Sequence, residues 1–164
     1  MTVHHDLQQL PVFKNAVITT GAFDGVHCGH LEIINRMKQI AQKVNGETII
    51  ITFDPHPRKI VKGGTESISI LTSIVEKTEL IRHFGIDHMV IVPFTDEFSK
   101  MTPEKYIESF LVKYFHPSTI IVGYDHRFGL NRSGDFHLLE QYGPLYQFKV
   151  IEIPEHVLHS ISIS

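Results

Sequence analysis

The sequence predicts a doubly wound α/β domain, in which helices cover both faces of a five-stranded parallel sheet. Short apolar runs alternate along the chain with segments of helical periodicity, an order typical of parallel strands joined by right-handed crossovers. Runs such as Ile49-Ile50-Ile51 are apolar at consecutive positions, as in strands that are covered on both faces. With 164 residues, the chain is expected to form one domain, residues 1–164.

The amino-terminal part contains the first two expected strands and the first helix. Residues 16–20 are an apolar run that predicts a buried strand, and helical periodicity follows from about Leu31 to Val44. Asn45-Gly46 predicts the end of this helix, and residues 47–53 predict the second strand. The segment 54–58 contains two prolines, which remove backbone donors and interrupt regular structure.

The next helix is predicted from its cap. Thr72 or Ser73 is expected to cap it, and Glu76 three residues after Ser73 has the spacing of a capping box, while Gly85 predicts the stop. The apolar residues expected on this helix are Val75, Leu80, Ile81 and Phe84.

The carboxyl-terminal part continues the alternation. Residues 88–92 predict the third strand, and Thr102-Pro103-Glu104 is a strong helix start. Residues 119–122 predict the fourth strand, residues 135–142 a short helix closed by Gly143, and residues 147–153 the fifth strand. The apolar face expected for the helix that begins near Thr102 consists of Tyr106, Ile107, Phe110, Leu111 and Tyr114.

Composition excludes several classes of protein. The net charge is −3 and the basic residues form no cluster, which argues against a nucleic-acid-binding surface. There is one cysteine, so an intrachain disulfide framework is excluded and a cytoplasmic location is expected. No apolar run reaches about 18 residues, the length that spans a membrane.

The segment from Gly21 to His30 has the features of a phosphate site. It follows a predicted strand and leads into a helix, whose first N–H groups and positive dipole end favour anions. Three glycines allow close approach of the backbone to a ligand. His27 and His30 are three residues apart, so near a helix start they can point to the same side and donate hydrogen bonds to phosphate oxygens.

Other readings of this segment are less well supported. A His-x-x-His pair beside Cys28 can belong to a zinc site, but no second ligand pair follows at a familiar spacing. The segment lacks the Gly-Lys-Ser/Thr ending of a Walker loop and the Gly-x-Gly-x-x-Gly pattern of the dinucleotide fingerprint.

The ten residues Gly21-Ala-Phe-Asp-Gly-Val-His-Cys-Gly-His30 resemble the His-x-Gly-His signature of the nucleotidyltransferase superfamily. Their form is similar to the FMN adenylyltransferase module of bacterial bifunctional riboflavin kinase/FAD synthetases. The resemblance implies a Rossmann-like sheet of the His-x-Gly-His type and catalytic roles for His27 and His30. The ATP-binding residues implied in this loop are Gly21, Ala22, Phe23, Asp24 and Gly29. For Asp24 itself, the favoured role is to orient a backbone turn.

The segment Thr52-Phe-Asp-Pro-His-Pro-Arg58 is similar to a family segment that lies near the flavin. The alternative reading is an ordinary turn at the exit of a strand. The flavin-binding residues that the resemblance implies here are Phe53, Pro55, His56, Pro57 and Arg58. Leu71-Thr72 and Glu76-Lys77 also match the family pattern, but helix capping is the favoured local role for them.

The segment Val122–Gly129, followed by Arg132-Ser-Gly-Asp135, is a second strong match, in which His126 stands where the family usually has Phe. The resemblance implies that Gly123 and Tyr124 bind the adenine end of ATP. The flavin-binding residues implied here are Asp125, Arg127 and Phe128. A solvated surface charge is the alternative reading for Arg127.

The end of the chain departs from the family pattern. A late Ser-Ser/Thr-x-x-Arg motif clamps phosphates in the superfamily, and here the chain ends at Ser164, where that motif should begin. Ser162 is expected to be one of its first residues and to contact ATP. We therefore expect a longer parent protein, with a riboflavin kinase domain downstream of residues 1–164.

The resemblance implies that the chain transfers the adenylyl group of ATP to FMN, giving FAD and pyrophosphate. Mg²⁺ is expected to be carried on the triphosphate, and no protein residue is assigned as a metal ligand. Neither a nucleic-acid nor a membrane partner is expected. One alternative is a nucleotidyltransferase with another phosphate acceptor; the other is a flavin- or nucleotide-binding module without turnover.

Overall fold

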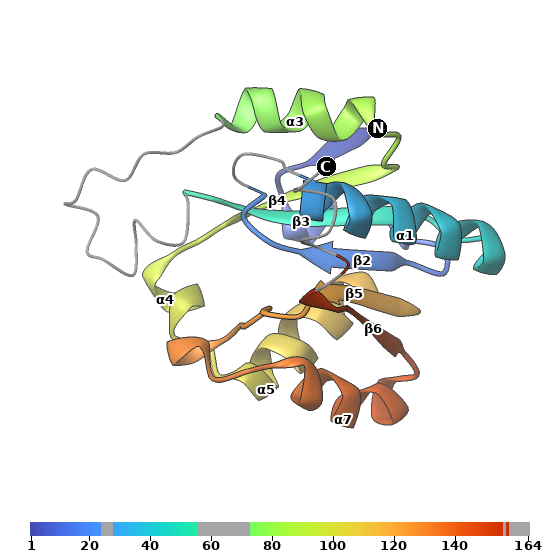
Figure 1. The fold of residues 1–164 in the computed structure, drawn as a ribbon. Helices are drawn as coiled ribbons and strands as arrows, with labels where there is room; N and C mark the ends of the chain where they lie inside the picture. The colour runs from blue at the N-terminus through green and yellow to red at the C-terminus, as the bar shows by residue number, and fades with distance from the viewer. Residues whose placement is uncertain (24–27, 56–72, 156, 158–164) are drawn as a thin grey trace.

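The structure is a computed structural model that describes residues 1–23, 28–55, 73–155 and 157. Its centre is a sheet of parallel strands in the order β1-β4-β3-β2-β5-β6 (Figure 1). The predicted doubly wound parallel sheet is confirmed, with six strands instead of five. The strands are β1 (Thr2–His4), β2 (Val17–Thr20), β3 (Thr48–Asp54), β4 (His88–Pro93), β5 (Thr119–Gly123) and β6 (Lys149–Ile153).

The strand that the sequence did not predict is β1. It pairs with β4 at the edge of the sheet, with Thr2 opposite His88 and His4 opposite Val90. Three residues are too few to show a period of two, so this strand leaves no signal in the sequence.

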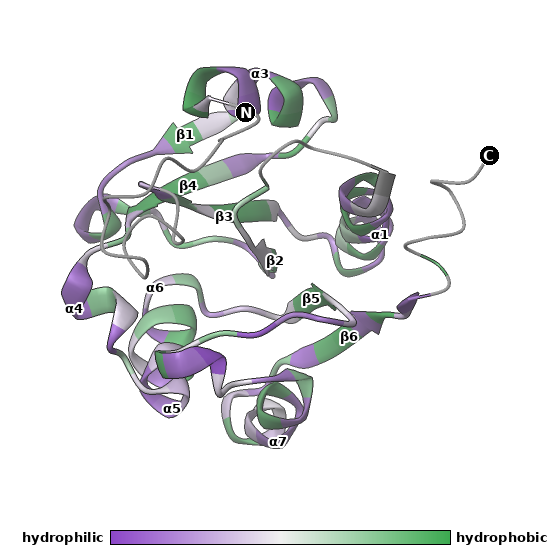
Figure 2. Ribbon diagram, turned by 60° about the vertical axis from the view of Figure 1, so that its left-hand side comes forward, coloured by the Kyte–Doolittle hydropathy of each residue, from purple (hydrophilic) through white to green (hydrophobic). Residues whose placement is uncertain are grey.

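Helices cover the sheet on both faces, as predicted. Helices α1 and α3 lie on one face, and the segment α5-η2-α6 lies with α7 on the other (Figure 2). In the described part of the chain, no helix is long and apolar enough to cross a lipid bilayer. The helical elements are η1 (Leu7–Gln9), α1 (Cys28–Val44), α3 (Ile74–His83), α4 (Asp96–Ser99), α5 (Pro103–Lys105), the π-helical η2 (Tyr106–Val112), α6 (Lys113–Phe115), η3 (Leu130–Arg132) and α7 (Phe136–Tyr146).

Alternate residues of each central strand contribute to two separate cores. In β3, Ile49 and Ile51 face η2 and α7, whereas Ile50 faces α1, and all three are fully buried. This double burial explains why the strand reads as a continuous apolar run.

The helical segment from Pro103 to Phe115 begins as predicted. The Thr102 hydroxyl accepts a hydrogen bond from the Lys105 amide and caps the first turn. The expected apolar residues at 106, 107, 110 and 111 are buried. Phe115 is buried at the end of the segment, whereas Tyr114 is only partly buried.

Helix α3 has the predicted cap but a different buried face. The Ser73 hydroxyl accepts from the Glu76 amide at 3.1 Å. Of the apolar residues expected on this helix, Val75 and Leu80 are exposed, with exposed fractions of 69% and 39%. The buried residues of the helix are Lys77 and Ile81, which are four positions apart and therefore share one face.

Helix α7 extends beyond its predicted end at Gly143. This glycine lies inside the helix, where a Cβ atom would be 2.6 Å from the Phe148 carbonyl oxygen, so its role is close packing against the following segment. The helix ends at Gln147, whose φ of 61° is left-handed. Strand β6 consequently begins at Lys149 and not at residue 147.

Candidate functional site

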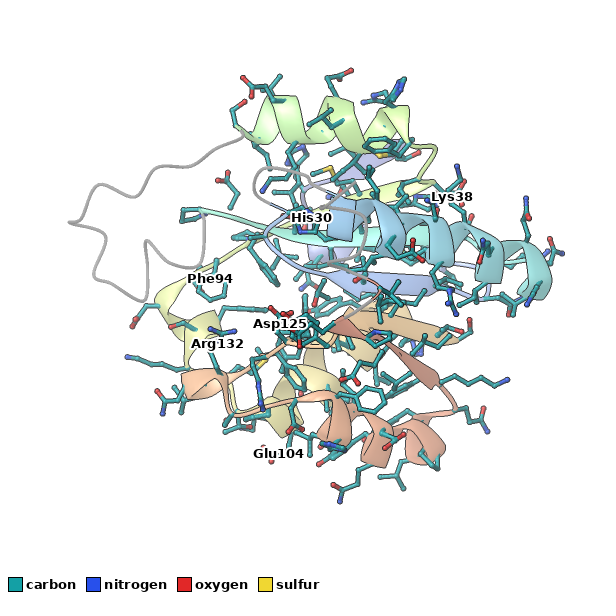
Figure 3. All side chains as sticks on the ribbon, in the orientation of Figure 1. His30, Lys38, Phe94, Glu104, Asp125 and Arg132 are labelled. Carbon is teal, nitrogen blue, oxygen red and sulfur yellow. The ribbon has the colours of Figure 1, made fainter. Side chains whose placement is uncertain are left out.

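The candidate site lies at the carboxyl edge of the sheet. Strand β2 is flanked there by β3 on one side and β5 on the other, so successive crossovers leave in opposite directions at this point. In such sheets the crevice beyond this switch point is the usual ligand site. Figure 3 shows His30, which follows β2, and Asp125, which follows β5, at this edge together with Phe94 and Arg132.

The loop after β2 is held to the sheet at three consecutive residues. The Gly21 amide donates to the Ile51 carbonyl at 3.0 Å. The Ala22 carbonyl accepts hydrogen bonds from the Thr52 hydroxyl at 3.2 Å and from the Lys77 ammonium group. Phe23 is 3% exposed, and its φ of 50° is unusual for an aromatic residue. This part of the loop therefore has a defined conformation before any ligand is bound.

His30 lies in the first turn of α1, beside this loop. Its ring packs against the ring of Phe23, with 4.7 Å between centroids and 36° between planes. Gly29 and His30 are at the helix end that favours anions, as predicted. The predicted partner His27 and the predicted ATP contact Asp24 lie outside the described residues.

The sequence analysis singled out Lys77 only for helix capping, whereas the structure places its side chain at the candidate site. It is 4% exposed, although lysine is almost never fully buried. Its ammonium group donates to the Ala22 carbonyl and lies 3.5 Å from the Thr52 hydroxyl oxygen. The spacing of Lys77 from Ile74 and Ile81 places the three residues on one helix face, which indicates that Lys77 is buried. The spacing does not indicate which group accepts its hydrogen bond.

On the other side of β2, a chain of polar groups connects three elements. The Tyr106 hydroxyl of η2 donates to the Thr20 hydroxyl at 3.3 Å, and Thr20 Oγ1 lies 3.5 Å from His126 Nε2. Burial raises the pKa of Tyr106 to about 12, against a smaller opposite effect of the hydrogen bond to Thr20. The tyrosine is therefore protonated throughout the neutral range and serves as a donor.

Three aromatic rings are stacked beside the polar groups of Tyr106, Thr20 and His126. Phe128 lies between Tyr106, at 5.0 Å and 27°, and His126, at 5.8 Å and 30°. Burial lowers the pKa of His126 to about 4; Asp125 acts in the opposite direction and Arg132 in the same one. His126 is thus a neutral ring at neutral pH.

The segment after Phe128 braces this stack. Phe128 and Gly134 exchange two backbone hydrogen bonds, of 3.2 and 2.8 Å, and a Cβ atom on Gly134 would overlap the Phe128 ring. Gly129 has a φ of 77° and lies against the backbone of Pro103. Gly129 and Gly134 therefore have structural roles.

Arg127 and Asp135 form an ion pair at the surface. Arg127 Nη1 lies 3.3 Å from one carboxylate oxygen of Asp135, and the other oxygen caps α7 through the Leu138 amide. The Arg127 side chain is 49% exposed. The structure thus places Arg127 in a solvated pair, while its predicted contact with flavin stays a prediction.

The predicted adenine contacts lie at the end of β5. Gly123 and Tyr124 are half-buried, and Asp125 is exposed. The pKa of Tyr124 is raised by burial, with smaller contributions from the carboxylates of Glu155 and Asp125. These positions face the end of the neighbouring strand β2, as the strand order requires.

Phe53 does not present an open surface. It is 9% exposed, and its ring packs against Phe94 and Phe98 at 5.5 and 5.6 Å and against Phe110 at 6.5 Å. A flavin contact at Phe53 would have to use the edge of this aromatic cluster. Pro55 is exposed after β3. The predicted contacts His56, Pro57, Arg58 and Ser162 lie outside the described residues.

The two sides of the site differ in chemistry. Around the loop after β2, a helix N-terminus, His30 and the Lys77 ammonium group favour a negatively charged ligand. Around Thr20, the polar groups and the stacked rings are neutral, and Tyr106 and Phe128 are 5% and 6% exposed because they cover one another. Among the described residues, no group of three or more His, Cys, Asp or Glu side chains is arranged to hold a metal ion.

Comparison with known proteins gives consistent similarities along the whole chain. A family model described as FAD synthetase matches residues 10–164. The bifunctional riboflavin kinase/FMN adenylyltransferase of Buchnera aphidicola subsp. Acyrthosiphon pisum is 32% identical over 160 residues, which cover 98% of this chain and 50% of that protein. The FAD synthetase of Listeria monocytogenes is 34% identical over 141 residues, which cover 86% of this chain and 56% of that protein. The chain thus spans about half the length of the curated relatives that it matches.

Among solved structures, one similarity concerns the fold alone. The crystal structure of a protein titled macrolide-efflux protein from Streptococcus pneumoniae superimposes with a TM-score of 0.76. The alignment covers 94% of this chain and 50% of that chain, at 20% sequence identity.

Proposed function

The chain belongs to the FAD synthetase family, and we propose that its domain transfers the adenylyl group of ATP to FMN, giving FAD and pyrophosphate. The observation that carries this proposal is the braced loop after β2, which leads into the N-terminus of α1 with His30 in its first turn. A triphosphate fits this arrangement because backbone donors, a helix dipole and an imidazole converge on one edge of the sheet.

The reaction requires no covalent enzyme intermediate. A phosphate oxygen of FMN forms a bond to the α-phosphorus of ATP while the bond from that phosphorus to the bridging oxygen breaks, and pyrophosphate leaves with the electron pair. His30 donates a hydrogen bond to a phosphate oxygen as negative charge accumulates, with His27 as its proposed companion. Catalysis then consists of alignment and charge stabilisation.

Mg²⁺ is proposed to enter bound to the triphosphate, where it offsets negative charge. Gly123 and Tyr124 are proposed to contact the adenine end of ATP. Asp125 and Phe128 are proposed to border the flavin, with the segment from Phe53 to Arg58 on the opposite side.

Residues 1–164 are proposed to be the adenylyltransferase part of a bifunctional parent, with riboflavin kinase activity located elsewhere in that parent. The names of the relatives and their greater length support this division. A cytoplasmic location is proposed because the single cysteine suits a reducing compartment.

The test is to incubate the chain with FMN, ATP and Mg²⁺ and to separate the flavins by chromatography. We expect FAD, and at least about 100-fold slower formation in His30→Ala, because the loss of one transition-state donor typically has that effect. His137→Ala is the matched control, since His137 is exposed on α7. Absence of FAD with FMN, but adenylylation of another phosphate acceptor, would contradict the proposed substrate. Equal turnover in His30→Ala would remove His30 from the chemistry.

A further inference from the structure

Lys77 links α3 to the loop that follows β2. The helix lies on the α1 side of the sheet, and Lys77 is the buried charged residue on its inner face. The ammonium group donates to the Ala22 carbonyl, which is 55 positions away in the chain, and lies 3.5 Å from the Thr52 hydroxyl oxygen. A buried cation is costly unless hydrogen bonds compensate for its lost hydration, so its position at this loop requires a reason.

The acceptor of this hydrogen bond controls the loop conformation. The peptide between Ala22 and Phe23 is planar, so a carbonyl directed toward Lys77 directs the Phe23 amide to the opposite side. Phe23 has a φ of 50°, a region that a bulky residue adopts only when its surroundings enforce it. Two donors, Lys77 and Thr52, hold the carbonyl directly before this residue.

The same contact extends to His30. The Phe23 ring is buried and packs against the His30 ring at 4.7 Å. A rotation of the Ala22–Phe23 peptide would therefore move the ring against which the imidazole rests.

We propose that Lys77 is the positioning residue of the phosphate site: it orients the Ala22–Phe23 peptide and, through the Phe23 ring, His30. The inference rests on the proposed function for the identity of the ligand, a nucleoside triphosphate, and on geometry alone for the role of Lys77.

A positioning role and a merely structural role of Lys77 predict different effects of Lys77→Met. A structural role predicts a lower stability of the fold, whereas a positioning role predicts a changed loop in a protein of unchanged stability. Methionine has a similar length and no charge, and an apolar replacement of a buried charged group is often neutral or stabilising. The Ala22 carbonyl would still accept from Thr52, so no buried acceptor would be left without a donor. We expect the urea midpoint of unfolding to be maintained, whereas the conformation of the loop changes.

The experiment compares the wild-type chain with Lys77→Met, Lys77→Arg and Lys38→Met. Lys38 is the matched control because it is exposed on α1 and its ammonium group also donates to a carbonyl, that of Phe84 at the end of α3, at 3.0 Å (Figure 3). The readouts are the Kd for ATP, the NMR resonances of the His30 ring and the hydrogen exchange of the Gly21 amide. In Lys77→Met we expect about ten- to hundredfold weaker ATP binding, shifted His30 resonances and faster Gly21 exchange. Lys77→Arg should recover part of each effect, and Lys38→Met should match the wild type.

Unchanged ATP affinity, His30 resonances and Gly21 exchange in a folded Lys77→Met chain would overturn the proposal. If Lys77→Met does not fold, the same three measurements are made on Lys77→Gln, which keeps an N–H donor without the charge. The same outcomes then support or overturn the proposal. None of these readouts depends on FMN or on FAD formation. A chain that makes no FAD therefore contradicts the proposed function without affecting this inference.

Discussion

Replacing His126 by phenylalanine should remove a pH-dependent part of the free energy of unfolding. Burial lowers the pKa of His126 from 6.5 to about 4, with Asp125 opposing and Arg132 reinforcing this effect. In the unfolded chain the same imidazole binds a proton below about pH 6.5. The unfolded state thus binds more protons than the folded state between these two values, and acid favours unfolding.

The magnitude follows from the two pKa values. A difference of about 2.5 between them corresponds to about 3 kcal/mol of stability, which is fully present above about pH 6.5 and fully lost below about pH 4. At about pH 5 the loss amounts to about 2 kcal/mol. Eleven other histidines and the carboxylates titrate in both proteins, so their contributions cancel in the difference between wild type and variant.

The assay is urea unfolding of the wild type, His126→Phe and His126→Gln at about pH 7 and about pH 5. Between these two conditions the wild type should lose about 2 kcal/mol more than either variant. The glutamine variant keeps a polar side chain near Thr20 but does not titrate, which separates the charge from the hydrogen bond. Parallel losses in all three proteins would refute the reasoning, because they would mean that His126 is protonated equally in both states.

Two further outcomes are expected. Gly134→Ala should lower the free energy of unfolding by about 1–3 kcal/mol, because the added methyl group overlaps the Phe128 ring. Ser133→Ala is the control and should lower it less. Urea unfolding measures both variants, and equal stability of Gly134→Ala and the wild type would contradict the tight packing. The amide protons of strand β1 should lose protection against exchange as the pH falls, because His4 Nε2 and His88 Nδ1 share a hydrogen bond of 3.1 Å that two imidazolium rings cannot form. The pKa of His4 is lowered by burial and then by His88 and His5, so this contribution is present above about pH 6.5 and is lost as the pH falls, even though Glu47 lies 3.5 Å from His88. Protection factors of β1, corrected for the intrinsic pH dependence of amide exchange, that stay constant with pH would contradict this prediction.

The parts of the fold that were predictable are those whose burial repeats along the chain. Strand β3 is covered on both faces and therefore reads as an uninterrupted apolar run. Strand β1 has three residues and one neighbour, so its existence depends on β4 and leaves no periodic pattern. Gly143 was read as a stop signal, whereas its small size serves contact with Phe148; a glycine in a sequence does not show which of these two properties is used.

The candidate site also contains residues that the sequence could predict and one, Lys77, whose role it could not. Gly21, Phe23 and His30 are close in sequence, so their convergence follows from a strand, a loop and a helix start in succession. Lys77 reaches the same loop from a separate helix, and its acceptor is a main-chain carbonyl, a group that every residue carries and that no motif can specify. Side-chain motifs thus reveal ligand contacts more readily than they reveal the groups that hold those contacts in place.

The distribution of charge around Thr20 favours one orientation of the proposed substrates. On the α1 side, the Lys77 ammonium group and a helix N-terminus make the site electropositive. On the η2 side, burial keeps Tyr106 protonated and His126 neutral, and both rings stack on Phe128. A triphosphate beside the loop after β2 would meet both of these positive groups, whereas a flavin ring placed there would leave the Lys77 side without an anion. We therefore expect the phosphates of ATP to lie beside the loop after β2.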